Sequence, residues 1–424
     1  MKVAVVAEYY PRAADPVLGI WAHRQALAAR EAGAEVRVLV LHRLVPPKAA
    51  VRALDLRAAG AILRQPRRAT LDGIEVEYVP FASPSRDRSY GSWGTWAAPA
   101  LALALARLRR RFAFELVHAH YAVPAGDAVR RIAPRAPLVV SVHGGDVLWT
   151  VHRGPRARRS VERTLSHARL VIANSAGTAE RCRRHGARAV RVVHLGTDLP
   201  HSARDAGAGG EEHAGEGTGG GEERAGEGTG GGEERGGGEA AGSPPTLVTV
   251  GHLVARKRHA DVVRALAALR PRHPDLRYVI VGDGPEREAI RRLAEQEGVA
   301  DRVELRGELP HEAAVREARA GTVFVLPSVD EAFGVAYVEA MAGGVPAVGS
   351  QGEDGPEELV AAGGGVRLVL PRDPPALAAA LDGLLSDDDA RRELGHQARA
   401  TVEREFTWER CGQDTVEAYA AALQ

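Results

Sequence analysis

Hydrophobic residues in the first 200 positions gather in short runs, separated by segments in which they recur every three or four residues. Nearly unbroken apolar runs of this length are typical of parallel strands covered on both faces, and the longer spacing is typical of helices. The runs predict strands at Val3–Ala7, Glu35–Leu41, Ile74–Phe81, Leu116–His120, Leu138–His143, Leu170–Asn174 and Val190–Leu195. The segments between them predict helices at Trp21–Ala32, Ala125–Ala133, Pro155–His167 and Ala176–Gly186.

The same alternation returns after residue 245 and predicts a second sheet. Its strands are expected at Thr246–Gly251, Tyr278–Gly282, Val303–Arg306, Val323–Leu326, Val345–Val348 and Val366–Leu370, with helices between them. An α/β pattern that occurs twice predicts two doubly wound domains, 1–200 and 246–406, whose strand-end loops face each other across a cleft. A last helix, Thr407–Leu423, should lie outside the second sheet, and residues 407–424 are expected to pack back on the N-terminal domain.

Residues 201–245 have a different composition. An 11-residue unit rich in Gly and Glu starts at Glu211, recurs almost unchanged at Glu222 and begins again at Glu233. The unit has no apolar seam, so it cannot offset the entropy of ordering. It predicts a disordered acidic linker between the domains.

Composition and charge narrow the class of protein. With 45% hydrophobic and 26% charged residues, the 424-residue chain is globular. Residues 1–200 carry 32 basic and 15 acidic side chains, hence +17, while the whole chain carries only +1. This asymmetry indicates an anionic partner for the first domain, either a membrane surface or an acidic substrate. Two cysteines exclude a disulfide framework, and the longest apolar run, 97–106, is half of the ~20 residues that span a bilayer.

The densest chemical signal lies at 327–342, where a strand ends, a short loop follows and a helix begins. Glu331 in the loop can reach a ligand hydroxyl, and Glu339 in the helix can accept two hydrogen bonds from a ribose diol. The free backbone N–H groups of Phe333, Gly334 and Val335 suit a phosphate. Eight residues at helical rise separate the two carboxylates by ~12 Å, which is more than the ~5–9.5 Å of a glycosidase pair. The spacing therefore favours binding over hydrolysis.

Cations follow the first strand of the second domain, in the segment 251–258. Arg256 and Lys257 on this strand-to-helix loop are well placed to neutralise a diphosphate, with His252 beside them. Gly282 belongs to a glycine-rich turn after the next strand. By itself such a turn is weak evidence for nucleotide binding. In the first domain, Gly19 opens the first helix and lets a phosphate approach the backbone.

Histidines mark the strand ends of the first domain. His118 and His120 share a face of one predicted strand, which is compatible with a metal site or with histidines that hydrogen-bond inside the core. No third ligand lies nearby in the sequence, and we therefore expect no metal. His143 and Asp146 end the next strand at the edge of the cleft.

At the glutamate segment the chain resembles the family 4 retaining glycosyltransferases, which have the GT-B fold of two Rossmann-like domains. The spacing from Glu331 to Glu339 matches the E-x7-E motif of that family, and the resemblance covers nearly all of the chain outside 201–245. Further segments that resemble the family are 19–21, 118–121, 143–146, 171–175, 279–285 and 323–328.

The resemblance implies roles for individual residues. Glu331 is expected to contact the donor sugar hydroxyls, Glu339 the ribose, and Lys257 the diphosphate. The candidate catalytic residues are Glu331, His120 and Lys257, with His143 and Asp146 in the vicinity of the sugar or the acceptor. The candidate donor-binding residues are Gly19, His252, Arg256, Lys257, Gly282, Phe333, Gly334, Val335 and Glu339.

Three positions depart from the family pattern. His252 stands where many members carry a phosphate-binding Arg, so that role is expected to pass to Arg256. Ala332 replaces a common Gly, and Leu195 replaces the usual Asn before the linker.

The resemblance implies a retaining hexosyltransferase that needs no metal or other cofactor, and in which the leaving phosphate takes the proton of the acceptor. The expected partners are a nucleotide-sugar donor, a glycan or lipid-linked acceptor and an anionic membrane surface, but no nucleic acid. The expected location is the cytoplasm, at the inner face of the membrane, in glycan, glycolipid or cell-envelope polysaccharide biosynthesis. The alternatives are a sugar-nucleotide epimerase of the same fold, against which the E-x7-E motif argues, and a non-catalytic nucleotide-sugar-binding protein.

Overall fold

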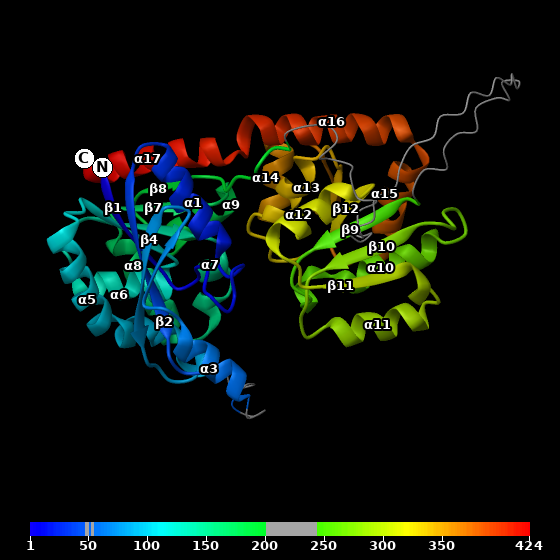
Figure 1. Ribbon diagram of the computed structural model, residues 1–424. Coiled ribbons are helices and arrows are strands. Elements are labelled where there is room, and N and C mark those ends of the chain that lie inside the picture. The colour runs from blue at the N-terminus through cyan, green and yellow to red at the C-terminus, as the bar shows by residue number, and fades with distance from the viewer. Residues whose placement is uncertain (47–50, 52–54, 201–243) are drawn as a thin grey trace, which may run out of the picture.

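The computed structural model describes residues 1–46, 51, 55–200 and 244–424. Two α/β domains lie side by side, each built on a mainly parallel sheet (Figure 1). The predicted architecture of two Rossmann-like domains is therefore confirmed. The linker predicted at 201–245 lies outside the described residues, except for its last two positions.

The N-terminal sheet has eight strands in the order β3-β4-β2-β1-β5-β6-β7-β8. Its pairs are parallel except β3 with β4, which is antiparallel. The strands are β1 (Lys2–Ala7), β2 (Glu35–Arg43), β3 (Arg68–Leu71), β4 (Ile74–Phe81), β5 (Leu116–His120), β6 (Leu138–Val142), β7 (Leu170–Ala173) and β8 (Val190–Val192). The helices of this part are α1 (Ile20–Glu31), α3 (Leu56–Arg64), α4 (Arg86–Ser89), α5 (Trp93–Arg111), α6 (Asp127–Ile132), α7 (Gly145–Leu148), α8 (Pro155–His167) and α9 (Ala176–Arg184).

The apolar runs of the strands are explained by burial on both faces of this sheet. On β1, Ala4 and Val6 join a core with α5, α6 and α8, whereas Val3 and Val5 join a second core on the opposite face with α1.

The C-terminal sheet has six parallel strands in the order β11-β10-β9-β12-β13-β14. They are β9 (Thr246–Val250), β10 (Arg277–Val281), β11 (Val303–Gly307), β12 (Val323–Leu326), β13 (Ala347–Ser350) and β14 (Val366–Val369). The helices are α10 (His259–Leu269), α11 (Arg287–Gln296), α12 (His311–Ala320), α13 (Val335–Met341), α14 (Asp354–Ala362), α15 (Pro374–Ser386) and α16 (Asp388–Glu405). Apolar side chains of α10, α11 and α15 cover one face, and those of α12, α13, α14 and α16 cover the other.

The chain then returns to the first domain. After the buried Phe406, α17 (Trp408–Leu423) runs beside α1, so that the C-terminus lies next to the N-terminus (Figure 1). Cys411 and Tyr419 of α17 belong to the same core as Val3 and Val5. Thr197 and Thr407 form an isolated bridge, so two segments that pass between the domains lie side by side.

Several elements of the N-terminal domain were not predicted, namely β3, α3, α4, α5 and α7. The edge strand β3 alternates between exposed and half-buried positions, so it lacks an apolar run. Helix α5 contains Pro99, yet its buried face of Ala97, Leu101, Ala104 and Leu108 packs on the sheet. Within the described residues, no helix is both long and apolar enough to cross a membrane.

Candidate functional site

Each sheet reverses its direction of winding at one point, and the candidate residues lie at these two points. In the N-terminal sheet the reversal falls between β1 and β5, and in the C-terminal sheet it falls between β9 and β12. Ligands of doubly wound folds bind beyond the carboxyl ends of the strands at such a switch point. His120 ends β5, while the loops after β9 and β12 carry Lys257 and Glu331.

Lys257 and Glu331 are in direct contact. Lys257 Nζ donates a hydrogen bond to Glu331 Oε2 at 2.5 Å, and Ser328 Oγ donates to the same oxygen at 2.8 Å. Burial opposes ionisation of Glu331, but the charges of Lys257 and Arg256 and these hydrogen bonds outweigh it and lower the pKa of Glu331. Glu331 is therefore an ionised carboxylate, able to accept hydrogen bonds from a ligand hydroxyl.

Arg256 connects this loop to its surroundings. Its guanidinium lies 3.8 Å from Glu331 Oε2 and 4.7 Å from the centre of the Trp149 ring, which belongs to the other domain. Its backbone carbonyl accepts a hydrogen bond from Val329 N at 2.8 Å, which ties the two loops together. Arg256 Nη1 is buried and has no hydrogen-bond partner among the described residues, so it is available to an anion.

Glu339 is buried on α13, and its carboxylate accepts no hydrogen bond from the described residues. His311 Nε2 lies 3.6 Å from Glu339 Oε1. Burial raises the pKa of Glu339 to about 7 and lowers the pKa of His311, so the two do not form a strong ion pair. His311 also lines a hollow of about 950 Å³ between α1 and the β11–α12 loop, with Arg24 on the opposite wall.

The start of α13 presents the expected amides. Gly334 is the N-cap, with φ 81°. Across the described residues, the N–H groups of Phe333, Gly334 and Val335 find no acceptor. The ring of Phe333 is buried and packs on His194 and Phe406, at centroid distances of 5.8 Å and 5.7 Å. Phe333 therefore contributes its backbone to the site and its side chain to the core.

Three glycines allow close approach of the backbone. A Cβ on Gly19 would lie 2.2 Å from the carbonyl carbon of Tyr9, and one on Gly282 would lie 2.2 Å from Gly251 O. Gly282 thus shapes the loop that carries Lys257. A Cβ on Gly144 would lie 2.2 Å from that of Ala332, so the two domains touch beside Glu331.

His120 and His143 form a buried pair. His120 Nδ1 lies 3.0 Å from His143 Nε2, and the rings are stacked at 5.3 Å. Burial lowers the pKa of His143 to about 4 and, with His118 and His143, that of His120 far below its ordinary value. Both rings are neutral, so one nitrogen of the close contact donates and the other accepts. In either tautomer, the outer nitrogens, His120 Nε2 and His143 Nδ1, are one donor and one acceptor, and neither has a partner among the described residues.

Asp146 supports the loop that follows β5. Its carboxylate accepts hydrogen bonds from Ala122 N at 2.8 Å and Val123 N at 3.2 Å. It is fully buried, and burial raises its pKa to about 7. Asp146 therefore positions the segment next to His120.

His118 is satisfied by the protein itself. Its ring lies 2.8 Å from Tyr419 Oη and 2.7 Å from Ser141 Oγ. Of the two interpretations that the sequence left open for His118, the structure agrees with a histidine that hydrogen-bonds inside the core. Over the described ranges, no group of three His, Cys, Asp or Glu side chains could hold a metal ion. His252 is exposed.

Some residues of the site gave no signal in the sequence. Trp149 stacks under Arg256, and Glu353 Oε2 accepts a hydrogen bond from Glu331 N at 2.8 Å. Both lie far from their partners along the chain, and neither belongs to a motif. Ser328, by contrast, stands in the segment that flanks the glutamate motif.

Comparison with known proteins agrees with this geometry. The family described as Glycosyltransferase Family 4 matches residues 18–200, and that described as Glycosyl transferases group 1 matches residues 232–401. The chain belongs to glycosyltransferase family 4. Together the two matches include β5, β9 and β12 of this family 4 chain, the strands that carry or precede His120, Lys257 and Glu331.

Curated relatives align over part of their length. A GDP-mannose-dependent alpha-(1-6)-phosphatidylinositol monomannoside mannosyltransferase of Mycolicibacterium smegmatis is 29% identical over 67% of this chain and 69% of its own. A D-inositol 3-phosphate glycosyltransferase of Corynebacterium urealyticum is 34% identical over 40% and 41%. An exopolysaccharide phosphotransferase of Streptomyces coelicolor is 37% identical, but only 16% of its length is covered. The family 4 chain thus matches less than half of the length of two of these three relatives.

Solved structures share the fold over the whole chain. Sucrose-phosphate synthase from Thermosynechococcus elongatus superposes with a TM-score of 0.72 at 19% identity, covering 99% of this chain and 98% of its own. The Anabaena protein HepE in complex with UDP and glucose gives 0.67 at 20% identity, covering 99% of both. These likenesses establish the GT-B fold of the family 4 chain.

Proposed function

We propose that this protein is a retaining, metal-independent glycosyltransferase. It moves a hexose from a nucleotide-diphosphate sugar to a hydroxyl of a glycan or lipid-linked acceptor. The observation that carries the proposal is the Lys257–Glu331 contact at the switch point of the C-terminal sheet, with Arg256 beside it. Among the relatives, one is named as GDP-mannose-dependent and a structural neighbour holds UDP and glucose, which supports a nucleotide-sugar donor.

The charges of the site fit a diphosphate leaving group. Lys257 and Arg256 stabilise the negative charge that develops as the bond to the sugar breaks. Glu331, ionised beside them, accepts hydrogen bonds from the sugar hydroxyls. Glu339 accepts them from the ribose when it is ionised. The amides at 333–335 face the phosphates from the start of α13.

The histidine pair bears on the path of the acceptor's proton. A neutral histidine with a pKa far below 6.5 is a weak general base near pH 7. His120 therefore orients hydroxyl groups, and the proton of the acceptor passes to the leaving phosphate, on the same face as the bond that breaks. This path retains the anomeric configuration.

A donor panel tests the proposal and its alternatives. The protein is incubated with UDP-, GDP- and ADP-hexoses, with and without a chelator, and the released sugar is followed by proton NMR. We expect slow release of one nucleoside diphosphate, equal in both conditions, with the anomer of the donor formed first. A changed hexose that is still attached to the nucleotide would identify an epimerase. Binding without turnover, with any acceptor added, would identify a non-catalytic protein.

We also propose that the N-terminal domain contacts an anionic membrane surface in the cytoplasm. Leu63 on α3 and Trp96 and Leu103 on α5 are exposed apolar side chains. The basic runs 64–68 and 107–111 lie at the C-terminal ends of the same two helices. Part of the basic charge is neutralised within the fold, because Arg107 and Arg111 pair with Glu77 at 2.9 Å and 3.2 Å. Co-sedimentation should occur with anionic vesicles and not with neutral ones, and should weaken at high salt. Equal partitioning to both would contradict this contact.

A further inference from the structure

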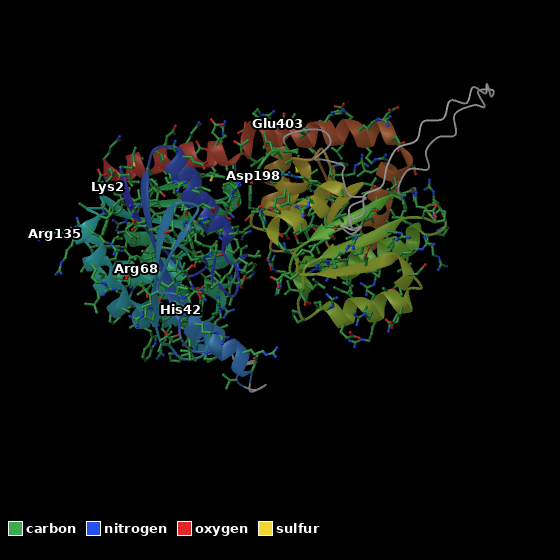
Figure 2. All side chains as sticks on the ribbon, viewed as in Figure 1. Lys2, His42, Arg68, Arg135, Asp198 and Glu403 are labelled. Carbon is green, nitrogen blue, oxygen red and sulfur yellow. The ribbon has the colours of Figure 1, made fainter. Side chains whose placement is uncertain are left out.

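A second pocket lies wholly within the N-terminal domain, at the carboxyl ends of β1, β2 and β4. Its volume is about 810 Å³. Much of its wall is apolar and comes from Leu18, Leu41, Ile62 and Trp93. His42, which also lines it, lies toward the end of the domain from which α3 projects (Figure 2). An apolar wall of this extent suits a ligand with a hydrocarbon portion.

The charges around this pocket are not balanced. Arg12, Arg43 and Arg86 line it, against the carboxylates of Glu8 and Asp15. Arg86 Nη1 lies 3.5 Å from Glu8 Oε1, and Arg12 donates to the backbone carbonyl of Glu8 at 2.9 Å. Counted by formal charge, one positive charge remains in excess, which a singly charged anion would balance. Guanidinium groups suit the oxygens of a phosphate in particular.

Three polar atoms on the wall lack a partner. Arg12 Nε, His42 Nδ1 and Ser85 Oγ are buried, and none makes a hydrogen bond with the described residues. His42 Nε2 is 2.9 Å from Ile62 O and must donate to it, so Nδ1 of the neutral ring is an acceptor. Buried polar groups are nearly always hydrogen-bonded. The pocket thus offers an N–H donor, a hydroxyl and an acceptor to a ligand that has both anionic oxygens and hydroxyl groups.

The pocket adjoins the switch point between β1 and β5. Glu8 and Leu18 on its wall are the chain neighbours of Tyr9 and Gly19, which touch each other. The Arg86 guanidinium lies 5.3 Å from the centre of the Tyr9 ring, and that ring lies 5.2 Å from the ring of Tyr121. Tyr121 follows His120 directly in the chain. A ligand in this pocket therefore lies one aromatic side chain away from the candidate transfer site.

We propose that this pocket binds the acceptor, through a singly charged phosphodiester joined to a hydrocarbon chain. The proposal rests on the proposed function, because it assigns the acceptor of that reaction. The arginines hold the phosphodiester and the apolar wall holds the chain, while the hydroxyl group that accepts the sugar extends past Tyr9 toward His120.

Soluble probes separate the two parts of this chemistry. Isothermal titration is carried out on the full chain with three compounds below their micelle concentrations. Dihexanoyl phosphatidylglycerol has the phosphodiester and the chains, glycerophosphoglycerol has only the phosphodiester, and dihexanoylglycerol has only the chains. We expect the first to bind at least tenfold more tightly than either of the others. Equal affinities for all three, or no binding of the first, would overturn the proposal.

A matched pair of variants locates the site. Ser85 precedes α4 as its N-cap, where Asp and Asn are both well tolerated. Ser85→Asp places a carboxylate in the pocket and should weaken binding of dihexanoyl phosphatidylglycerol at least tenfold, whereas Ser85→Asn should stay within threefold of wild type. Arg86→Ala should also weaken it about tenfold, and Arg109→Ala, which removes an arginine outside the pocket, should not. Equal affinities of Ser85→Asp and Ser85→Asn would overturn the assignment.

Nucleotide binding by the same samples distinguishes failure of the acceptor pocket from failure of the proposed function. If a nucleoside diphosphate binds and dihexanoyl phosphatidylglycerol does not, the acceptor pocket is wrong and the proposed function stands. If no nucleoside diphosphate binds, the proposed function itself fails.

Discussion

The two switch points of this molecule hold their polar groups in opposite electrostatic states. In the C-terminal domain, Lys257 and Arg256 keep Glu331 ionised in spite of its burial. In the N-terminal domain, burial keeps His120 and His143 neutral, and within the described part of the chain no carboxylate is hydrogen-bonded to either. The charged side is suited to a diphosphate and the neutral side to hydroxyl groups, which fits the proposed reaction between a nucleotide sugar and an acceptor hydroxyl.

The largest effect should come from breaking the charged side. Lys257→Ala and Glu331→Ala should each lower kcat by about 100- to 1,000-fold, the loss typical of one missing stabiliser of developing charge. Steady-state kinetics with the donor found in the panel measure this, with Arg291→Ala, an exposed position on α11, as the control. Wild-type turnover in a folded Glu331→Ala variant would remove Glu331 from the site.

The same pair should show coupling in stability. Lys257→Met and Glu331→Gln each leave a buried charge without its partner, and each should cost about 3 kcal/mol of unfolding free energy. The double variant Lys257→Met/Glu331→Gln should cost less than the two single variants together, because both charges are removed. Urea denaturation of the four proteins measures the coupling, and strictly additive losses would show that the contact has no energetic role.

The neutral side should give a smaller loss. His120→Asn keeps a polar side chain but changes the position of its donor and acceptor, and should lower kcat by about 10- to 100-fold through lost orientation. The rate should show no rise with pH near 6.5 that depends on His120, because burial, with His118 and His143, holds its pKa well below that ordinary value. A rising limb that His120→Asn abolishes would make this histidine a general base and contradict its neutral role.

Glu339 is intermediate between the ionised Glu331 and the neutral histidine pair, because burial raises its pKa to about 7. Donor KM should fall as pH rises from 6 to 8, because the ionised carboxylate accepts the ribose hydrogen bonds, and Glu339→Gln should remove this dependence. Its kcat should stay within about threefold, since a ribose contact is largely uniform binding. An unchanged donor KM in Glu339→Gln at pH 8 would place Glu339 outside the donor site.

The stability of the ligand-free protein gives a second measure of Glu339. The folded pKa lies above the unfolded value of 4.5, so the folded state holds the proton more tightly and stability falls as pH rises from 4.5 to 7. Glu339→Gln should reduce this fall by about 1–3 kcal/mol. Urea denaturation at pH 4.5, 6 and 7.5 measures it, and parallel curves for both proteins would contradict the raised pKa.

The smallest effect should come from Arg256→Lys. The charge near Glu331 is kept, but the planar group that stacks on Trp149 is lost. We expect a loss of kcat/KM of about threefold to tenfold. Trp149→Phe, which keeps an aromatic ring, should be milder than Trp149→Ala, and equal losses would show that stacking is not the cause.

The sequence predicted the sheets well because their strands are buried on both faces, and burial leaves a local record in apolar runs. The strand β3 left none, since its exposed positions carry polar residues. Ser175 and Asp387 are typical helix-capping residues, and both cap their helices, since their side chains accept hydrogen bonds from Thr178 N and Ala390 N. Capping is a local contact, and the sequence states it directly.

The contacts between candidate residues are a different case. The motifs named Lys257 and Glu331 separately, but their hydrogen bond spans 74 positions and depends on β9 lying next to β12. His120 and His143 meet because β5 pairs with β6, which brings His120 opposite Ser141. Trp149 and Glu353 belong to the site only because the fold brings their segments against Arg256 and Glu331. The sequence alone does not give the order of the strands in a sheet or the contacts between the two domains.

The most direct test of the central claim is the binding of nucleoside diphosphates to the charged side of the cleft. UDP, GDP and ADP are titrated calorimetrically in the presence of EDTA onto the wild type, Lys257→Ala and the control Arg291→Ala. We predict that one nucleotide binds the wild type and Arg291→Ala equally, without added metal, and that Lys257→Ala weakens it at least tenfold. Binding that requires a divalent cation, or that is the same in Lys257→Ala, would contradict the account.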